Sequence, residues 1–183
     1  MEKMHGPWRV LQTETKYKDE FLSLCVDEVI KPNGEPGSYA TVQLKKGVAV
    51  LALDRDGKVY LTKQFRYATG ADSIEVICGG MDEGEEPLAA ARREAREELG
   101  VEGEQWEALD FLYLETSMIK GPVHLFVVKD LHCTTTDPDD TEDIKGFKVS
   151  LPEAVKMVMR GQITHGPSCA LLLKAYLTGK QID

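Results

Sequence analysis

The sequence lacks any long hydrophobic run. No apolar stretch in its 183 residues reaches the roughly 18 residues that a membrane-spanning helix requires. The opening residues, MEKMHGPWRV, contain no apolar core of the kind that a secretory signal peptide carries. We therefore expect a cytoplasmic protein with no membrane partner.

Paired cysteines are also missing. The spacing of the four cysteines matches neither a zinc motif nor a disulfide framework; they are Cys25, Cys78, Cys133 and Cys169. We expect all of them to be reduced thiols. His165 lies four residues before Cys169 but has no third partner for nucleophilic chemistry, so we interpret it as a helix-cap residue.

Basic charge is scarce. The chain has 22 Lys and Arg against 31 Asp and Glu, a formal net charge of −9. Binding to nucleic acid needs a basic surface, so we expect no nucleic-acid partner. Walker and Rossmann glycine motifs are absent as well. An anionic substrate would require a divalent metal ion and local Arg or Lys side chains to reverse the sign of the charge in its pocket.

What the sequence does contain is a glycine-rich turn that runs into an acidic helix. Residues 79–101 read GGMDEGEEPLAAARREAREELGV. Helix positions three and four apart share a face, so Glu94 and Glu98 lie one turn apart with Glu97 beside them. Another face has the spacing of a core stripe and carries Leu88, Ala91, Ala95 and Leu99. Carboxylates this close repel one another unless a cation intervenes, and Mg²⁺ is the usual oxygen-bound cation.

This segment resembles the signature of the Nudix hydrolases. That signature is Gly, five residues, Glu, seven residues, Arg-Glu, an aliphatic residue, any residue, Glu-Glu, any residue, Gly and an aliphatic residue. The residues at its fixed positions are Gly79, Glu85, Arg93, Glu94, Ala95, Glu97, Glu98, Gly100 and Val101. A solvated, salt-bridged helix is the alternative interpretation, but it does not explain the glycines or the spacing.

The resemblance implies Mg²⁺ as cofactor, with Mn²⁺ as a possible substitute. It assigns metal binding to Glu94 and Glu98, while Glu97 shares a metal ion or a metal-bound water. The backbone carbonyl of Cys78 would be a further ligand. The thiol of Cys78 has a separate interpretation as a small, buried apolar group.

Other site residues follow from the same resemblance. Arg93 would hold the loop against the helix and keep Glu85 fixed, which orients the metal ligands. Gly80 lets the backbone approach a substrate phosphate without a Cβ in the way. Arg66 is a candidate for binding a substrate phosphate, since guanidinium matches two phosphate oxygens. Glu75 matches a residue that contacts metal-bound water or substrate.

The general base is expected in an acidic loop, DPDDTED, at residues 137–143. We favour Glu142, with Asp140 as the alternative. A solvated run of charge is the competing interpretation of this loop.

The order of predicted elements favours an α/β fold. We expect strands over residues 8–15, 20–30, 39–44, 48–53, 59–65, 73–78, 107–115, 123–129 and 147–150. We expect helices in the signature and over residues 151–160 and 168–177. This pattern predicts a Nudix-type α/β/α sandwich over residues 47–183, preceded by a small antiparallel β domain over residues 1–46.

The whole chain is similar to the branch of this superfamily that hydrolyses ADP-ribose and other nucleoside-diphosphate sugars. In that branch the N-terminal sheets exchange between two subunits, so the resemblance implies a homodimer. It also implies hydrolysis of the diphosphate of a small nucleotide sugar, ADP-ribose first, to a nucleoside monophosphate and a sugar phosphate. GDP-mannose, a dinucleoside polyphosphate or an oxidised nucleotide stay open as substrates, and a non-catalytic binding module is the rival class.

Two positions depart from the branch. Thr116 stands where relatives that cleave ADP-ribose commonly carry a proline. Ile77 and Cys78 stand where many relatives have Pro-Ala or Pro-Gly. Neither change touches the acidic residues of the signature, so both bear on substrate preference and not on the reaction.

Overall fold

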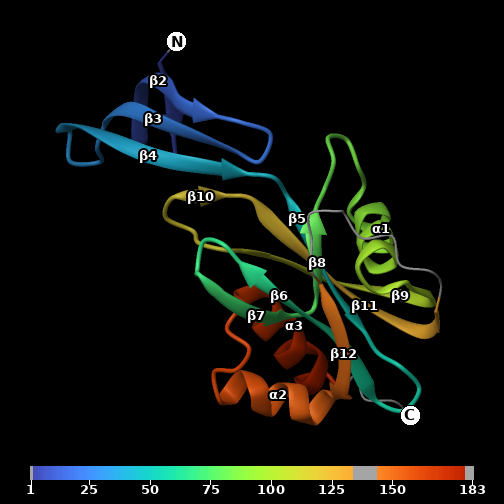
Figure 1. Cartoon of the computed structure of the whole chain (residues 1–183). Helices are drawn as coiled ribbons and strands as arrows, with labels where there is room; N and C mark the ends of the chain where they lie inside the picture. Colours follow the sequence, from blue (N-terminus) through green and yellow to red (C-terminus); the bar gives the residue numbers. More distant parts are fainter. Residues whose placement is uncertain (1, 134–143, 180–183) are drawn as a thin grey trace. The chain divides into compact units, whose positions relative to one another are not determined.

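The computed structural model describes residues 2–133 and 144–179, and for Cys133 it describes the backbone alone. The chain divides into two compact units. One comprises Met1–Lys45 with Tyr113–Pro122, and the other comprises Lys46–Leu112 with Val123–Asp183. Figure 1 shows the elements of each unit coloured along the sequence.

The first unit is a five-stranded sheet. Its strands are β1 (Lys3–His5), β2 (Trp8–Lys18), β3 (Leu22–Ile30), β4 (Pro36–Leu44) and β10 (Ile119–Lys120), in the spatial order β1-β2-β3-β4-β10. Antiparallel pairing joins β2 to β3 and β3 to β4, while β10 runs parallel to β4 with Ile119 opposite Val42. Gly34 turns the chain between β3 and β4 at a φ of 86°, a conformation that costs glycine nothing sterically.

The segment 113–122 lies in the first compact unit, although residues 47–183 are predicted to form one domain. Pairing of β10 with β4 brings it into the first unit. A boundary between functional domains at residues 46 and 47 stays a prediction.

The second unit contains most of the remaining elements. Its strands are β5 (Gly47–Ala52), β6 (Lys58–Arg66), β7 (Ala71–Glu75), β8 (Ile77–Gly80), β9 (Val101–Tyr113), β11 (Pro122–Cys133) and β12 (Lys145–Ser150). Its helices are α1 (Pro87–Leu99), α2 (Leu151–Met159) and α3 (Gly166–Leu177). The strands form a sheet in the order β8-β5-β11-β9 and a second sheet in the order β12-β6-β7.

Strand β5 has a hydrophobic core on each of its faces. Val50 lies in the cluster that includes Ala91 of α1, and Leu51 lies in the cluster that includes Leu171 of α3. All of these side chains are fully buried. Successive strand residues point to opposite faces, so the apolar run of β5 supplies both cores. Figure 1 shows α1 separated from α2 and α3 by the strands. The predicted α/β/α sandwich is therefore confirmed.

Helix α1 presents small side chains to this sheet. Pro87 occupies its first turn, where a fixed φ favours helix initiation, and Gly100 ends it at a φ of 57°. Ala91 and Ala95 are fully buried, which allows the helix backbone to lie close to the strands.

The prediction of the apolar stripe of α1 is wrong at Leu88, the first residue of that stripe. Leu88 is 37% exposed, whereas Glu98 is only 6% exposed. The buried face of α1 also includes Ala90. It is therefore centred closer to the carboxylates than predicted, and Leu88 lies at the edge of this face. The acidic face and the packed face of α1 therefore overlap at Glu98.

Strand β9 begins at Val101, directly after the helix cap, and not at residue 107 as expected. Its first residues are mostly polar, which hid the strand in the sequence. Gly103 lies very close to β11. A Cβ at this position would lie 2.5 Å from Val128 Cγ2 and 2.7 Å from the carbonyl oxygen of Lys129, so a larger residue would collide with that strand. Glycine thus allows β9 to pack closely against β11.

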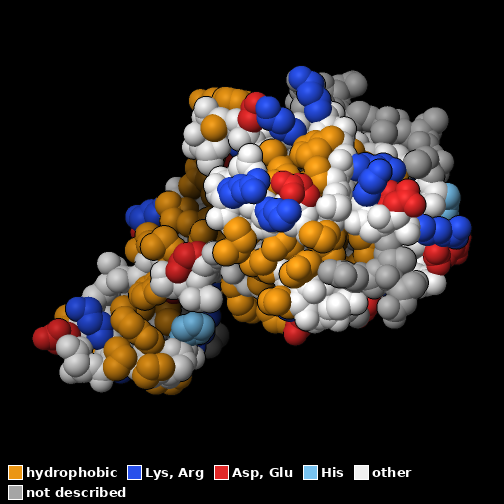
Figure 2. Space-filling view, turned by 90° about the horizontal axis from the view of Figure 1, so that it is seen from below, with side chains coloured by type: hydrophobic (Ala, Val, Ile, Leu, Met, Phe, Trp, Pro, Cys, Tyr) orange, Lys and Arg blue, Asp and Glu red, His pale blue; other side chains and the backbone are white. Residues whose placement is uncertain are grey.

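The described helices are all too short or too polar to cross a membrane. On the face drawn in Figure 2, Lys and Arg side chains are interspersed with Asp and Glu, with hydrophobic side chains between them. This face offers no continuous basic surface among the described residues.

Candidate active site

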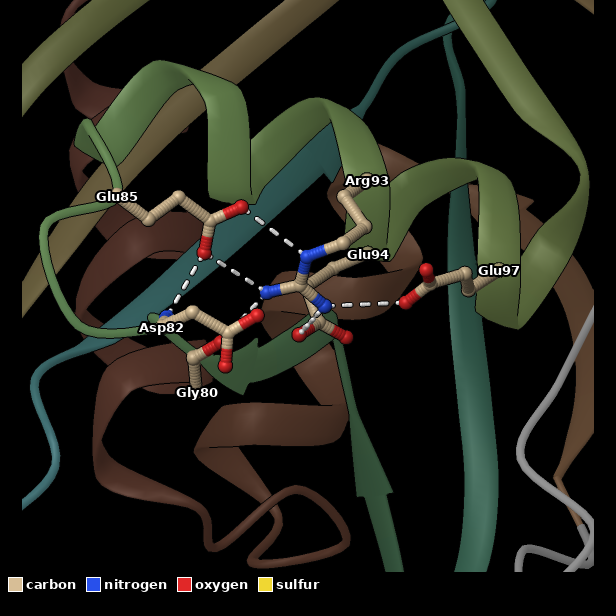
Figure 3. Close-up of polar contacts among 6 residues, drawn as sticks. All are labelled: Gly80, Asp82, Glu85, Arg93, Glu94 and Glu97. Carbon is tan, nitrogen blue, oxygen red and sulfur yellow. Dashed lines mark hydrogen bonds and ion pairs between the residues drawn. The ribbon is translucent and has the colours of Figure 1, made fainter.

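Arg93 joins α1 to the preceding loop through a network of charged hydrogen bonds (Figure 3). Its Nε and Nη2 donate to the two carboxylate oxygens of Glu85 at 3.1 and 3.0 Å. Its Nη1 donates to Glu94 Oε1 at 2.7 Å and to Glu97 Oε2 at 3.0 Å. Nη2 also donates to the carbonyl oxygen of Gly80 at 2.8 Å. One guanidinium therefore holds three carboxylates and the loop backbone in a fixed arrangement.

The loop between β8 and α1 is itself ordered by Glu85. Its Oε2 accepts a hydrogen bond from the backbone N–H of Asp82 at 2.9 Å. The side chains of Glu85 and Arg93 are 17% and 27% exposed, so solvent screens this pair less than a surface pair. The hydrogen bonds that Arg93 donates to Glu85, and then those to Glu94 and Glu97, raise the pKa of Arg93 far above its usual value despite partial burial.

Gly79 provides the space that the carboxylate of Glu94 occupies. A Cβ on Gly79 would lie 1.9 Å from Glu94 Cδ and 2.1 and 2.2 Å from its two oxygens. Gly79 is part of β8 and lies opposite Val48 of β5. A paired strand therefore faces Glu94, and any larger residue at position 79 would displace the carboxylate.

The three acidic residues of α1 suit a hard divalent cation. The side chains of Glu94 and Glu97 are 12% and 32% exposed, and Glu98 follows on the next turn with 6% exposure. Carboxylate oxygens are the ligands that Mg²⁺ prefers, and partial burial strengthens their need for positive charge. The donor set of these residues fits such an ion.

A second pair, Arg66 and Glu75, lies on adjacent strands β6 and β7. Arg66 donates from Nε to Glu75 Oε1 at 2.9 Å and from Nη2 to Oε2 at 2.7 Å. The side chain of Glu75 is only 2% exposed, while that of Arg66 is 38% exposed. Burial alone would raise the pKa of Glu75, but the hydrogen bonds from Arg66 and the proximity of His165 outweigh it and lower the pKa. The pair thus presents a fixed guanidinium toward solvent.

His165, just before α3, is directed toward Glu75. Its Nδ1 lies 3.5 Å from Glu75 Oε2, 4.0 Å from the Sγ of Cys78 and 2.8 Å from the Oγ of Ser168. Ser168 Oγ in turn accepts the backbone N–H of Val76 at 3.0 Å. His165 occupies the N-cap position of α3, as the helix-cap interpretation predicts, but its side chain makes no capping hydrogen bond. Burial lowers the pKa of His165, so the imidazole is neutral at neutral pH.

The two clusters adjoin at Glu98. The pKa of the Cys78 thiol is raised well above its usual value. Burial makes the largest contribution, followed by the negative charges of Glu98 and Glu75. The charge of Glu98 also contributes to the raised pKa of Arg66, after the larger effect of its hydrogen bonds to Glu75. Glu98 therefore acts electrostatically on the Arg66–Glu75 pair as well as belonging to the acidic face of α1.

A family profile described as "NUDIX domain" matches residues 43–169, which is more than half of the chain. The chain belongs to the Nudix family. A second profile, described as "Nucleoside diphosphate sugar hydrolase N-terminal domain", matches residues 8–42. The predicted family and its nucleoside-diphosphate-sugar branch are confirmed by these two matches together.

Similar proteins and structures agree with this assignment. A protein named ADP-ribose pyrophosphatase from Bacillus subtilis (strain 168) is 28% identical over 152 residues, covering 82% of each chain. A protein named GDP-mannose pyrophosphatase from Citrobacter koseri is 30% identical over 135 residues, covering 69% of this chain and 71% of that protein. A crystal structure named ADP compounds hydrolase superposes with a TM-score of 0.82 at 19% identity, over 99% of this chain and 100% of the other. That structural likeness shows the fold, and the sequence relatives support a Nudix hydrolase.

The predicted site residues that the structure describes fall into two groups in space. Arg93 gathers Glu85, Glu94, Glu97 and Gly80 around itself. The other predicted residues of the described chain meet around Glu75 and are Arg66, Cys78 and Glu98. Their individual roles in catalysis and binding stay predictions. Glu142 and Asp140, the candidates for general base, lie outside the described residues.

Sequence reasoning missed His165 and Ser168 as neighbours of this Nudix site. His165 meets Cys78 across 87 positions of sequence. The sequence paired His165 with Cys169 because they are close along the chain, but the thiol of Cys169 bonds to the carbonyl oxygen of Ile163 instead. Only the packing of α3 against the sheet brings His165 to the site, so no local pattern could have identified it.

Proposed function

We infer that this protein hydrolyses the diphosphate bond of a nucleoside-diphosphate sugar in the presence of Mg²⁺, with ADP-ribose as the substrate. The proposal rests on the carboxylates of α1 and its preceding loop. Arg93 holds them through hydrogen bonds, and the carboxylate of Glu94 lies against Gly79. The similarity to a protein named ADP-ribose pyrophosphatase, over 82% of both chains, supports this substrate. The products would be a nucleoside monophosphate and a sugar phosphate.

The chemistry requires positive charge at a fixed place. Hydrolysis of a diphosphate develops negative charge on the phosphoryl oxygens in the transition state. Mg²⁺ or Mn²⁺ held by Glu94, Glu97, Glu98 and the carbonyl of Cys78 would stabilise that charge and lower the pKa of the attacking water. Arg93 keeps two of these carboxylates aligned before substrate arrives, which avoids reorganisation during the reaction.

Arg66 is proposed to bind a substrate phosphate. Glu75 already orients its guanidinium through two hydrogen bonds, while 38% of the Arg66 side chain stays exposed. A guanidinium that is held in advance loses less conformational entropy when it binds phosphate. Gly80 is exposed at the end of β8, where the absence of a Cβ permits close approach of a phosphate.

Glu142 is proposed as the general base on the strength of the family resemblance, with Asp140 as the alternative. We expect Glu142→Gln to lower kcat by about 10²–10⁴-fold with a much smaller change in KM. Asp140→Asn is the matched comparison within the same loop. A loss in Glu142→Gln of less than about threefold would exclude Glu142 as the base.

The proposal is tested with a panel of nucleotide sugars and Mg²⁺. Purified protein is incubated with each substrate and then with phosphatase, and the released phosphate is measured in the presence and absence of EDTA. We expect Mg²⁺-dependent turnover of ADP-ribose that EDTA abolishes. Turnover of no member of the panel would overturn the proposal in favour of a non-catalytic binding module.

GDP-mannose is the second candidate substrate, because a GDP-mannose pyrophosphatase is 30% identical to this chain. Preferential turnover of GDP-mannose in the same panel would assign the protein to that activity. Turnover confined to a dinucleoside polyphosphate or an oxidised nucleotide would place it elsewhere among Nudix hydrolases. A homodimer formed through the N-terminal sheet and a cytoplasmic location are proposed from the family resemblance.

A further inference from the structure

We propose that Glu75, Cys78 and His165 form a second cation site, which binds a thiophilic divalent ion such as Zn²⁺ beside the Mg²⁺ site. The three residues come from β7, β8 and the residue before α3, all within the second unit. The Nudix signature does not include the Cys78 thiol or His165.

The spacing of the donor atoms already approaches that of a coordinated ion. Glu75 Oε2 and His165 Nδ1 are 3.5 Å apart, and His165 Nδ1 and Cys78 Sγ are 4.0 Å apart. All three donor atoms lie within 4.8 Å of one another. In a tetrahedral zinc site, bonds of about 2.0–2.3 Å place neighbouring donors roughly 3.3–3.8 Å apart. Small side-chain rotations would bring these donors to that separation.

The donor types distinguish this site from the carboxylates of α1. Thiolate and imidazole bind Zn²⁺ and similar ions far better than they bind Mg²⁺. A histidine binds metal through its neutral imidazole, which offers a nitrogen lone pair to the ion. Binding of the ion would replace the S–H bond of Cys78 with a metal–sulfur bond and release the proton to solvent, because a coordinating thiol is deprotonated.

Two existing contacts would compete with the ion. Ser168 Oγ lies 2.8 Å from His165 Nδ1, and this hydrogen bond would have to break before the nitrogen could bind the ion. Arg66 bonds to both oxygens of Glu75, although each carboxylate oxygen has a second lone pair for a metal. The side chain of His165 is 28% exposed, so an ion can reach the imidazole from solvent.

Occupation of this site would inhibit the proposed hydrolysis. Arg66 and Glu75 are the residues proposed to bind substrate, and an ion on Glu75 would place positive charge beside the Arg66 guanidinium and shift it. This consequence rests on the proposed function. Binding of the ion does not, because it depends only on the donor atoms.

The test uses Co²⁺ as a spectroscopic probe of the full-length protein in the presence of excess Mg²⁺. A Co²⁺–thiolate bond gives a near-ultraviolet charge-transfer band, whereas Co²⁺ bound by carboxylates alone does not. We expect the wild-type protein to develop this band with one equivalent of Co²⁺ and to lose it when Zn²⁺ is added. No band at saturating Co²⁺ in the wild-type protein would overturn the proposal, whatever its activity.

Variants then identify the thiol that gives rise to the charge-transfer band. Cys78→Ser should abolish it, and His165→Ala should weaken Co²⁺ binding by more than about tenfold. Cys169→Ser is the matched control, because its thiol lies on α3 and bonds to the Ile163 carbonyl, so the band should be unchanged. A band that persists in Cys78→Ser, or that disappears in Cys169→Ser, would contradict the assignment. Circular dichroism of each variant separates loss of the site from loss of the fold.

Activity provides a separate readout. Micromolar Zn²⁺ added to the Mg²⁺-loaded enzyme should inhibit the wild-type protein and Cys169→Ser alike, and should inhibit Cys78→Ser less. If the panel shows no hydrolysis but the cobalt band appears, the cation site stands and the proposed function fails. If hydrolysis occurs without the band, the proposed function stands and the cation site fails.

Discussion

The guanidinium of Arg93 donates hydrogen bonds to Glu85, Glu94 and Glu97, so its removal takes away the cation that these carboxylates share. We expect Arg93→Ala to lower the free energy of unfolding by about 2 kcal/mol, a typical cost for losing hydrogen bonds to charged groups. Added Mg²⁺ should restore part of this loss by supplying positive charge to Glu94 and Glu97. Urea unfolding with and without Mg²⁺ measures both effects.

Arg92→Ala is the matched control for that measurement. Arg92 is exposed on the same helix, and its guanidinium lies over the Trp106 ring, 5.7 Å from the centroid. We expect it to cost no more than about 1 kcal/mol, with no response to Mg²⁺. Equal losses in the two variants would show that Arg93 has no special structural role.

Gly79 tests whether the position of Glu94 matters for activity. A Cβ at Gly79 would collide with the carboxylate end of Glu94, which is a flexible group that can move away. We therefore expect Gly79→Ala to fold with nearly wild-type stability but to lose kcat/KM by about a hundredfold, as for removal of one transition-state contact. Steady-state kinetics and thermal unfolding together check this result.

Gly166→Ala serves as the control for Gly79→Ala. Gly166 has no atom within 4 Å of its would-be Cβ and its φ is not positive. The substitution should leave kcat/KM unchanged. If Gly79→Ala were as active as Gly166→Ala, the close approach of Glu94 to β8 would be irrelevant to catalysis.

Residues of the signature were predictable from the sequence because a helix fixes their relative positions at short range. Glu94, Glu97 and Arg93 are within four positions of one another, and the structure joins them directly. His165 was not predictable as a neighbour of Cys78, since their approach depends on how α3 packs. Local periodicity carries no information about such contacts.

At the scale of elements, the pairing of β6 with β7 holds Arg66 against Glu75. We expect Arg66→Met to lower the free energy of unfolding at pH 7 by about 2 kcal/mol, because it leaves a carboxylate that is 2% exposed without its guanidinium. This expected loss of unfolding free energy is smaller than the loss for a fully buried ion pair, because the side chain of Arg66 is 38% exposed. Urea unfolding at pH 7 measures it.

The pH dependence of that loss follows from Glu75. Its pKa in the folded wild-type protein is lowered, so its stabilising contribution is present above the usual carboxyl value of 4.5 and is lost as pH falls through the lowered pKa. In Arg66→Met, burial would raise the pKa of Glu75, and the carboxyl would protonate at higher pH. The stability difference between the two proteins should therefore begin to narrow above pH 4.5, as Glu75 of the variant protonates, and should narrow further as pH falls through the lowered pKa of the wild type.

Lys63→Met is the control on the same strand. Lys63 pairs with Asp72 at 2.9 Å, but their side chains are 48% and 55% exposed. An exposed pair contributes at most about 1 kcal/mol, so the cost should be small at every pH. A loss in Arg66→Met no larger than that in Lys63→Met would contradict the structural role assigned to Arg66.

Most helices and strands were predictable, and the errors have local causes. The apolar run of β5 and the cap residues of α1 predicted both elements nearly as they occur. The start of β9 was missed because a partly exposed strand with polar residues looks like a loop. The burial of Glu98 was missed because periodicity places a residue on a face, whereas packing decides how far that face extends.

At the scale of the whole molecule, the family resemblance predicts a homodimer through the N-terminal sheet. We expect light scattering at micromolar concentration to give twice the mass of the chain. Deletion of the N-terminal segment up to residue 45 should produce a monomer or an insoluble protein. A stable monomer of the intact chain would remove the predicted exchange of sheets.

The central claim is that the acidic face of α1 binds Mg²⁺ and thereby drives hydrolysis of a diphosphate. The most direct test is kcat for ADP-ribose at saturating Mg²⁺ in the wild-type protein and in Glu98→Gln, with Arg96→Gln on the exposed face of the same helix as control. The account predicts a loss of at least about a hundredfold in Glu98→Gln and none in Arg96→Gln. Activity in Glu98→Gln within about threefold of wild type would contradict it.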